Sequence, residues 1–163
     1  MADTTSRDPQ LATDGTIVGF YEREFYPFSN FSSYQVRWRG ELWATSEHAY
    51  QAAHFFQTAP DLADAIRSCS SAHEAYTIAK ANTAKLPADW DNQKIPIMTD
   101  IVRAKCMQHD YIRKQLRKTG TLLIVEDSPK DSFWGWGPDR QGRNELGKIW
   151  MKLREELRAS GEL

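Results

Sequence analysis

Long apolar runs are missing from this sequence. No stretch approaches the ~18 apolar residues of a membrane-spanning helix, and the first residues carry no apolar segment of the kind found in signal peptides. Cysteine is scarce, and the spacing of Cys69 and Cys106 matches no zinc-binding or redox motif. We therefore expect two reduced, half-buried thiols in a cytoplasmic or nuclear protein that does not associate with membranes.

A large net charge is also missing. The 21 basic and 22 acidic residues leave a formal charge of −1, so no overall field attracts nucleic acid or an anionic membrane. A polyanionic partner would have to be held by a few local groups. The basic residues within 113–118 are more typical of a solvated helix face than of a nucleic-acid-binding stripe.

Aromatic residues are abundant, and six tryptophans are many for a chain of 163 residues. This length corresponds to one domain with a substantial core. Residues 1–15 are polar and predict a flexible N-terminal tail, which leaves 16–163 as the domain. The sequence shows no internal repeat and no linker that would divide this domain further.

Hydrophobic periodicity, turn residues and capping residues predict the elements of the domain. Short strands are expected at 16–20, at 34–38, where the alternation reaches a turn at Arg39-Gly40, and at 122–126. One helix is expected from Thr45 or Ser46 to about Phe56. Pro60 opens another over 61–68, and Ser71 caps a third through about Ala81. Two more are expected from about Ile95 to Lys118 and over 144–159. This order predicts an α+β fold: a helix-dominant single domain with a few short strands.

One carboxylate, Glu47, is predicted at a helix start among aromatic and amide side chains. In the first helical turn the dipole favours the ionised carboxylate, whereas packing against Trp43 and Tyr50 would oppose ionisation by desolvation. Such opposed effects are typical of a carboxylate that activates water or stabilises positive charge. The same position also fits an ordinary first-turn glutamate.

Two histidines lie close to Glu47 in the sequence, but they do not indicate a metal site. His48 and His54 are six residues apart and fall on different faces of the predicted helix. The Glu-His order also reverses that of the H-E-x-x-H zinc motif. We therefore predict no metal and no cofactor.

A loop rich in glycine and tryptophan is predicted over 127–143. Gly135 allows backbone amides to come close to a ligand, and the helix start that follows favours a phosphate. Trp134 offers a stacking surface, and Asp131 offers a second carboxylate. A surface loop without function is the alternative, although 15 or more residues without secondary structure are uncommon in a compact domain.

Three further residues are candidates. Trp90 lies in a predicted inter-helix loop, where it would cover a base or simply cap the core. Lys80 and Lys105 are flanked by apolar or small residues. A partly buried lysine can bind phosphate or, when desolvated, attack a sugar aldehyde. Most lysines in such settings are structural.

Taken together, the sequence resembles the NADAR (YbiA-like) family, which is named for its association with NAD and ADP-ribose. The resemblance runs from about Val18 to Arg158. The residues that carry it are Phe20-Tyr21, Phe28-Ser29-Asn30-Phe31, Trp43, Thr45-Ser46-Glu47-His48, Gln51, Asp89-Trp90, Lys105, Glu126, Asp131, Trp134-Gly135, Gly142, Asn144 and Gly147.

The resemblance implies an N-glycosidase that cuts the bond between ribose C1 and a nitrogen. Two substrate classes are associated with the family: ADP-ribose attached to the guanine amino group in nucleic acid, and the phosphoribosyl-amino intermediates of riboflavin synthesis. By position, Glu47 corresponds to the catalytic acid/base, Asp131 to a supporting carboxylate and Lys105 to a further catalytic candidate. The residues assigned to substrate binding are Phe20, Tyr21, Ser29, Asn30, Lys80, Trp90, Trp134, Gly135 and Asn144.

Two departures from the bacterial members favour the first substrate class. Those members usually carry Gly-Arg where this chain has Ala79-Lys80, so a phosphate here would lack the bidentate fork of arginine. They also tend to have a polar residue where Trp136 adds stacking surface. We therefore expect a monomeric hydrolase acting on an ADP-ribose-containing substrate, on DNA or RNA.

The mechanism expected from these residues is a hydrolysis without metal. Positive charge builds at ribose C1 as the base leaves, and Glu47 would stabilise it and deprotonate the attacking water. In a variant of this mechanism, Lys105 or Lys80 traps the opened ribose as an imine. A different class of function, a non-catalytic reader of ADP-ribose or a related nucleotide, would use the same pocket. A protein-binding adaptor would instead need a large exposed apolar patch on the closing helix.

Overall fold

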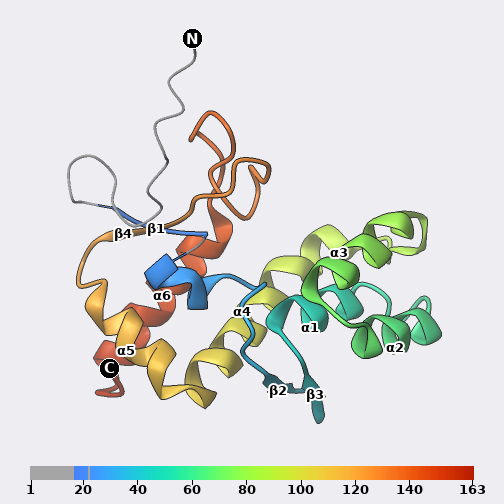
Figure 1. Cartoon of the computed structure of the whole chain (residues 1–163), viewed down its shortest axis with the longest axis horizontal. Helices are drawn as coiled ribbons and strands as arrows, with labels where there is room; N and C mark the ends of the chain where they lie inside the picture. The colour runs from blue at the N-terminus through green and yellow to red at the C-terminus, as the bar shows by residue number, and fades with distance from the viewer. Residues whose placement is uncertain (1–16, 22) are drawn as a thin grey trace. The chain divides into compact units, whose positions relative to one another are not determined.

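The computed structural model describes residues 17–21 and 23–163, so the tail predicted at 1–15 lies outside the described residues. The described residues form six α-helices, two short 3-10 helices and four strands (Figure 1), which confirms the predicted α+β, helix-dominant fold. This domain divides into two compact units. One unit comprises residues 30–110, and the other combines the N-terminal residues up to Ser29 with residues 111–163.

In the unit 30–110, a β-hairpin precedes the helices. Strands β2 (Val36–Trp38) and β3 (Glu41–Trp43) pair antiparallel, with Val36 opposite Trp43. Arg39 and Gly40 turn the chain with φ values of 51° and 79°, as a tight two-residue hairpin requires. The strand and turn were predicted, whereas β3 was not, because two of its three residues are exposed and show no alternation.

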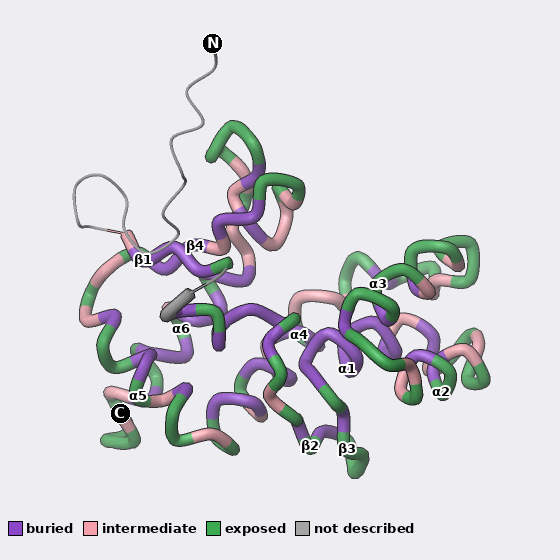
Figure 2. The backbone as a smooth tube through the Cα atoms, viewed as in Figure 1, coloured by how far each residue is buried: buried purple, intermediate pink, exposed green. Residues whose placement is uncertain are grey.

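Helix α1 (Ser46–Ala53) is the centre of this unit. All eight of its residues are buried, as Figure 2 shows, and it packs against three other helices. The small side chains of Ala49, Ala52 and Ala53 allow this close approach. Around it lie α2 (Pro60–Ser68), α3 (Ala72–Ala81) and α4 (Trp90–Gln108). The short 3-10 helix η2 (Thr83–Lys85) lies between α3 and α4 in the chain. The predicted starts of α2, at Pro60, and of α3, after the capping residue Ser71, are confirmed.

The single helix predicted over 95–118 is wrong in two respects. Helix α4 begins five residues earlier, at Trp90, and it ends before His109, whose φ of −130° and ψ of 106° are extended. Helix α5 (Asp110–Lys118) then follows. The imidazole of His109 contacts the Gln35 carbonyl oxygen at 2.6 Å and the Tyr34 ring edge-on. These long-range contacts stabilise the break between α4 and α5 at His109. Helical periodicity cannot predict such contacts.

The other unit is built on a parallel strand pair. Strands β1 (Ile17–Phe20) and β4 (Leu123–Glu126) align with Ile17 opposite Leu123, and α6 (Glu145–Ala159) packs on β4. The 3-10 helix η1 (Arg23–Phe28) follows β1. The Phe28 and Trp150 rings make a tilted contact with centroids 4.7 Å apart, and the Trp150 indole N–H donates to the Phe28 carbonyl oxygen. None of the helices among the described residues is long and apolar enough to span a bilayer.

Candidate active site

The start of α1 positions the main catalytic candidate. Thr45 is the N-cap residue, and its hydroxyl oxygen accepts from the His48 backbone N–H at 3.2 Å. The N-cap residue lies one position before Ser46, so Glu47 falls in the first turn of α1. The dipole of this helix end stabilises a negative charge there.

The Glu47 carboxylate is almost entirely buried, with 5% of the residue exposed. The Gln51 side-chain amide donates to the Glu47 Oε1 atom at 2.6 Å. The i, i+4 spacing of the two residues places them on one face of the helix. A hydrogen bond to an ionised carboxylate is short and strong, so Gln51 fixes the orientation of this group. A buried carboxylate held in one orientation is suited to taking a proton from water and stabilising an adjacent positive charge.

The loop at Asn30–Ser32 joins Glu47 to the second catalytic candidate. The Glu47 backbone N–H donates to the Asn30 carbonyl oxygen at 3.0 Å. Two residues later, the Ser32 hydroxyl oxygen accepts from the Lys105 ammonium at 2.8 Å. Since consecutive Cα atoms are about 3.8 Å apart, the structure brings Lys105 and the first turn of α1 to the same short loop.

Lys105 has the properties of a reactive amine. It is fully buried in α4, where its nitrogen lies 5.6 Å from the centre of the Tyr34 ring. Burial lowers the pKa of Lys105 from 10.5 to about 7, against a small opposing effect of Cys106. A large share of the amine is therefore neutral near pH 7, which is the nucleophilic form.

Asn30 contributes an acceptor to the same region. Its side-chain N–H donates to the Met98 sulfur atom at 3.2 Å, and the residue is 6% exposed. Among the described residues, the Asn30 Oδ1 atom has no hydrogen-bond partner. A buried acceptor without a donor is costly, so a hydroxyl or amino group of a ligand would be favoured there.

Trp90 does not lie in an inter-helix loop, as predicted, but is the first residue of α4. It is buried, and its ring makes tilted contacts with the His54 ring, with centroids 4.1 Å apart, and with the Tyr50 ring at 5.8 Å. Burial lowers the pKa of His54 to about 4, so the imidazole is neutral and its Nδ1–H donates to the Tyr50 carbonyl oxygen. The contact between His54 and Trp90 was not predicted, because no local sequence pattern indicates that these two rings meet.

Lys80, the alternative lysine, lies on the exposed face of α3. Its nitrogen lies 3.3 Å from the Tyr76 hydroxyl, one helical turn away. An exposed ammonium retains its hydration and is a weaker nucleophile than a desolvated amine. The geometry therefore supports Lys105 over Lys80 as the lysine with a chemical role.

Three predicted binding residues lie near the start of the other unit. Phe20 is fully buried and packs edge-on against Phe28 at 5.8 Å, so it contributes to the core. Tyr21 is 41% exposed, whereas Ser29 is buried and its backbone N–H donates to the Tyr26 carbonyl oxygen.

The glycine- and tryptophan-rich loop is ordered by its own hydrogen bonds. The Asp131 Oδ1 atom accepts from the backbone N–H groups of Phe133 and Trp134 at 2.9 and 2.8 Å. At Gly135, a Cβ atom would lie only 2.7 Å from the Glu126 carbonyl oxygen, so no larger residue fits. Trp136 donates its indole N–H to Asp127. Trp134 is half-buried in the same loop.

Asn144 ends this loop in the left-handed region, with a φ of 51°. Its amide donates to the Ile124 carbonyl oxygen at 2.9 Å and accepts from the Glu126 N–H at 3.0 Å, so it ties the loop to β4. The first amides of α6 were expected to bind a phosphate. Those of Glu145 and Leu146 instead donate to carbonyl oxygens of Phe133 and Trp134, so these two donors are already used.

Comparison with known proteins gives a consistent result. The family model described as the NADAR domain matches residues 19–158. The N-glycosidase Npun_R5314 of Nostoc punctiforme is 42% identical over 132 residues, which cover 80% of this chain and 85% of that protein. The N-glycosidase YbiA of Escherichia coli K12 is 34% identical over 150 residues, which cover 91% of this chain and 92% of that protein.

Two further matches extend the comparison. The NMR structure of E. coli YbiA matches with a TM-score of 0.82 and 32% identity, covering 95% of this chain and 92% of that one. The riboflavin biosynthesis protein VVA0006 of Vibrio vulnificus is 37% identical over 142 residues, which cover 86% of this chain but 38% of that protein. The family resemblance is thus confirmed over nearly the whole described domain: the chain belongs to the NADAR family.

Proposed function

We propose that this chain is an N-glycosidase that hydrolyses a ribose C1–N bond and removes ADP-ribose from the guanine amino group of modified DNA or RNA. The observation that carries the proposal is the buried Glu47 carboxylate, fixed by Gln51 at the N-terminus of α1. The names of the Nostoc and E. coli relatives, both N-glycosidases, support the reaction type.

The reaction assigned to Glu47 is a water attack at C1. As the C1–N bond breaks, its electron pair leaves with the guanine nitrogen and positive charge develops on the ribose. The Glu47 carboxylate stabilises that charge and takes a proton from the attacking water, whose oxygen bonds to C1. The proton then passes to the departing nitrogen, which yields ADP-ribose and restored guanine.

A covalent variant assigns the attack to Lys105. Its neutral amine, favoured by burial and a pKa of about 7, would bond to C1 while the C1–N electron pair leaves with the guanine nitrogen, and the proton lost by the amine passes to that nitrogen. Opening of the ribose ring gives an imine, which water then hydrolyses to release the sugar and the amine. Sodium borohydride added during turnover would reduce this imine to a stable adduct at Lys105, visible by mass spectrometry; absence of an adduct would exclude the variant.

The alternative substrates are phosphoribosyl-amino intermediates of riboflavin synthesis, in line with the name of the Vibrio relative. Lys80 in place of the usual arginine offers a phosphate a point charge rather than a bidentate fork. It also lies exposed beside Tyr76. These features, with Trp136 in the loop, favour ADP-ribosylated guanine as the preferred substrate.

A side-by-side assay tests the proposal. The protein is given a guanine-ADP-ribosylated oligonucleotide and, separately, phosphoribosyl-amino pathway intermediates, and release of ADP-ribose or base is followed. We expect rapid release from the oligonucleotide. Release from the pathway intermediates alone would contradict the preferred substrate. Binding of ADP-ribose without release from any substrate would indicate a non-catalytic reader instead.

A further inference from the structure

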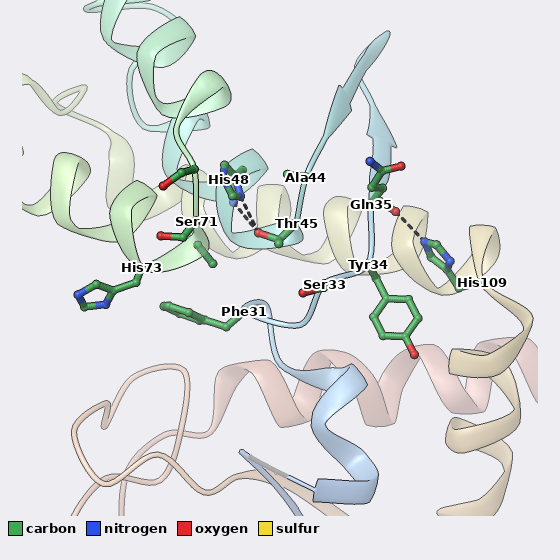
Figure 3. Close-up of a pocket in the computed structure, with 12 residues that line it drawn as sticks. Phe31, Ser33, Tyr34, Gln35, Ala44, Thr45, His48, Ser71, His73 and His109 are labelled. Atoms are coloured by element: carbon green, nitrogen blue, oxygen red, sulfur yellow. Dashed lines mark hydrogen bonds between the residues drawn. The ribbon is translucent and has the colours of Figure 1, made fainter.

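A cavity of about 760 Å³ lies in the unit 30–110, and none of the catalytic candidates lines it (Figure 3). It is bounded by the segment 31–35, the start of α1, the start of α3 and His109. Thr45 and His48 line it, and they flank Glu47 in the same helical turn. The cavity therefore adjoins the first turn of α1, the turn that also carries Glu47, although the Glu47 side chain does not line it.

The lining combines aromatic surface with uncharged hydrogen-bonding groups. Phe31 is 38% exposed, and Figure 3 shows it beside His73 at one end of the cavity. The remaining polar side chains are hydroxyl, amide and imidazole groups: Ser33, Tyr34, Gln35, Thr45, His48, Ser70, Ser71 and His109. None of the lining residues is a carboxylate, a lysine or an arginine. A volume within the range of ligand pockets and an exposed ring suit a heteroaromatic base, since every base can stack on such a ring.

The end of the cavity near Phe31 also offers hydrogen-bond donors. Ser71 caps α3, and its hydroxyl is bonded to the Glu74 N–H. In the described part of the chain, the backbone N–H groups of Ala72 and His73 have no hydrogen-bond acceptor, as expected in a first helical turn. The Glu74 carboxylate, the acidic group on this turn, is engaged by the N–H and hydroxyl of Ser70.

Two hydrogen bonds fix the His48 side chain in the wall of the cavity. Its Nε2 atom lies 3.2 Å from the Cys69 carbonyl oxygen, which can only accept, so Nε2 carries the proton. Its Nδ1 atom then accepts from the Thr45 hydroxyl at 2.8 Å. With both nitrogens bonded, His48 joins α1 to the segment before α3 and keeps the cavity open without being a free donor.

We propose that this cavity is a nucleotide subsite, with a base stacked on Phe31 and its phosphate at Ser71–His73. The proposal rests on the proposed function, because it gives a substrate with more than one nucleotide unit a second point of attachment beside Glu47. Two parts of that substrate share this chemistry: the nucleotide next to the modified guanine in the strand, and the adenylate half of ADP-ribose. The lack of lysine and arginine predicts a small salt dependence for either.

Three matched substrates separate these sources: an ADP-ribosylated oligonucleotide, ADP-ribosylated GMP, and the same GMP adduct trimmed to a phosphoribosyl group. The blocking variant is Ala44→Trp, which fills the cavity from an exposed lining position. Its control is Ala84→Trp, at an exposed position outside the cavity. Phe31→Leu and His73→Ala remove the stacking ring and the imidazole while leaving Glu47 untouched.

If the strand neighbour occupies the cavity, Ala44→Trp raises KM for the oligonucleotide by about tenfold or more, the value of one lost stacking contact. KM for the GMP adducts and kcat then stay near the wild-type values. If the adenylate occupies it, KM rises for both ADP-ribosylated substrates and not for the trimmed one. Equal effects on all three substrates, or no difference from Ala84→Trp, would overturn the proposal.

A direct measurement of nucleotide binding tests the subsite whether or not the proposed cleavage occurs. Calorimetric titration with GMP should show binding that Ala44→Trp and Phe31→Leu weaken by about tenfold, whereas Glu47→Gln leaves it unchanged. Guanosine and inorganic phosphate should each bind more weakly than GMP. If no substrate is cleaved, loss of GMP binding in the variants still supports the subsite. GMP binding that is equal in wild type and variants would contradict it.

Discussion

Replacing the buried lysine Lys105 with methionine should change the pH dependence of folding stability. Methionine has a similar length and no charge, and it keeps the apolar contacts of the lysine stem in α4. The change removes the hydrogen bond to Ser32, at a cost of about 1 kcal/mol. It also removes an amine whose pKa falls from 10.5 to about 7 on burial.

The magnitude follows from that pKa difference. The folded state disfavours the ammonium form, so the penalty on folding grows as the pH falls from 10.5 towards 7 and is constant below 7. At pH 7 it amounts to about 4 kcal/mol and at pH 9 to about 2 kcal/mol. Relative to Lys105→Met, the wild type should therefore gain about 2 kcal/mol between pH 7 and pH 9.

Thermal unfolding of both proteins from pH 6 to pH 9 measures this difference. For a domain of this size the gap in melting temperature should narrow by about 4–8 °C between pH 7 and pH 9, with the variant more stable at pH 7. Lys80→Met, at an exposed lysine, is the matched control, and its gap should not depend on pH. If the difference in melting temperature between the wild type and Lys105→Met did not change with pH, burial would not lower the pKa of this lysine.

Two further predictions concern His54 and Asn144. Burial lowers the pKa of His54 from 6.5 to about 4, so NMR titration of its ring nitrogens should find the imidazole neutral at pH 5. A titration midpoint above pH 6 would contradict the desolvated arrangement of His54 against Trp90. Because the folded state disfavours the imidazolium, stability should fall as the pH drops from 6.5 to 4. Asn144→Ala loses two amide hydrogen bonds and places alanine at a φ of 51°, for a loss of about 2–4 kcal/mol in chemical denaturation. Asn144→Gly loses the same hydrogen bonds without the backbone strain and should cost about 1 kcal/mol less; equal losses would argue against strain.

Elements set by local rules could be predicted from the sequence. Pro60 and Ser71 start α2 and α3 where expected, and the alternation and turn of the first hairpin strand were recognisable. The hydrogen bond between Gln51 and Glu47 follows from their i, i+4 spacing. These features depend on neighbours within one helical turn or one hairpin, so the sequence contains what is needed to expect them.

The features that the sequence did not reveal depend on distant partners. The interruption at His109 is stabilised by Gln35 and Tyr34, more than 70 positions away. The bond from Lys105 to Ser32 spans 73 positions. No periodicity or capping rule reports such pairs.

The glycine-rich loop shows the same limit for function. Its composition suggested that the amides at the start of α6 bind a phosphate. The fold instead directs two of them to the carbonyl oxygens of Phe133 and Trp134. Whether a helix start is open to a ligand depends on the path of the loop before it, and composition does not determine that path.

The proposed function requires the Glu47 carboxylate to perform the chemistry rather than to be an ordinary first-turn glutamate. Single-turnover cleavage of guanine-ADP-ribosylated oligonucleotide by Glu47→Gln tests it directly, with Asp61→Asn as control, because Asp61 is an exposed carboxylate in the first turn of α2. We expect Glu47→Gln to slow cleavage by about 10²–10⁴-fold while ADP-ribose still binds, and Asp61→Asn to cleave like the wild type. Cleavage by Glu47→Gln within a few-fold of the wild-type rate would contradict the proposed function.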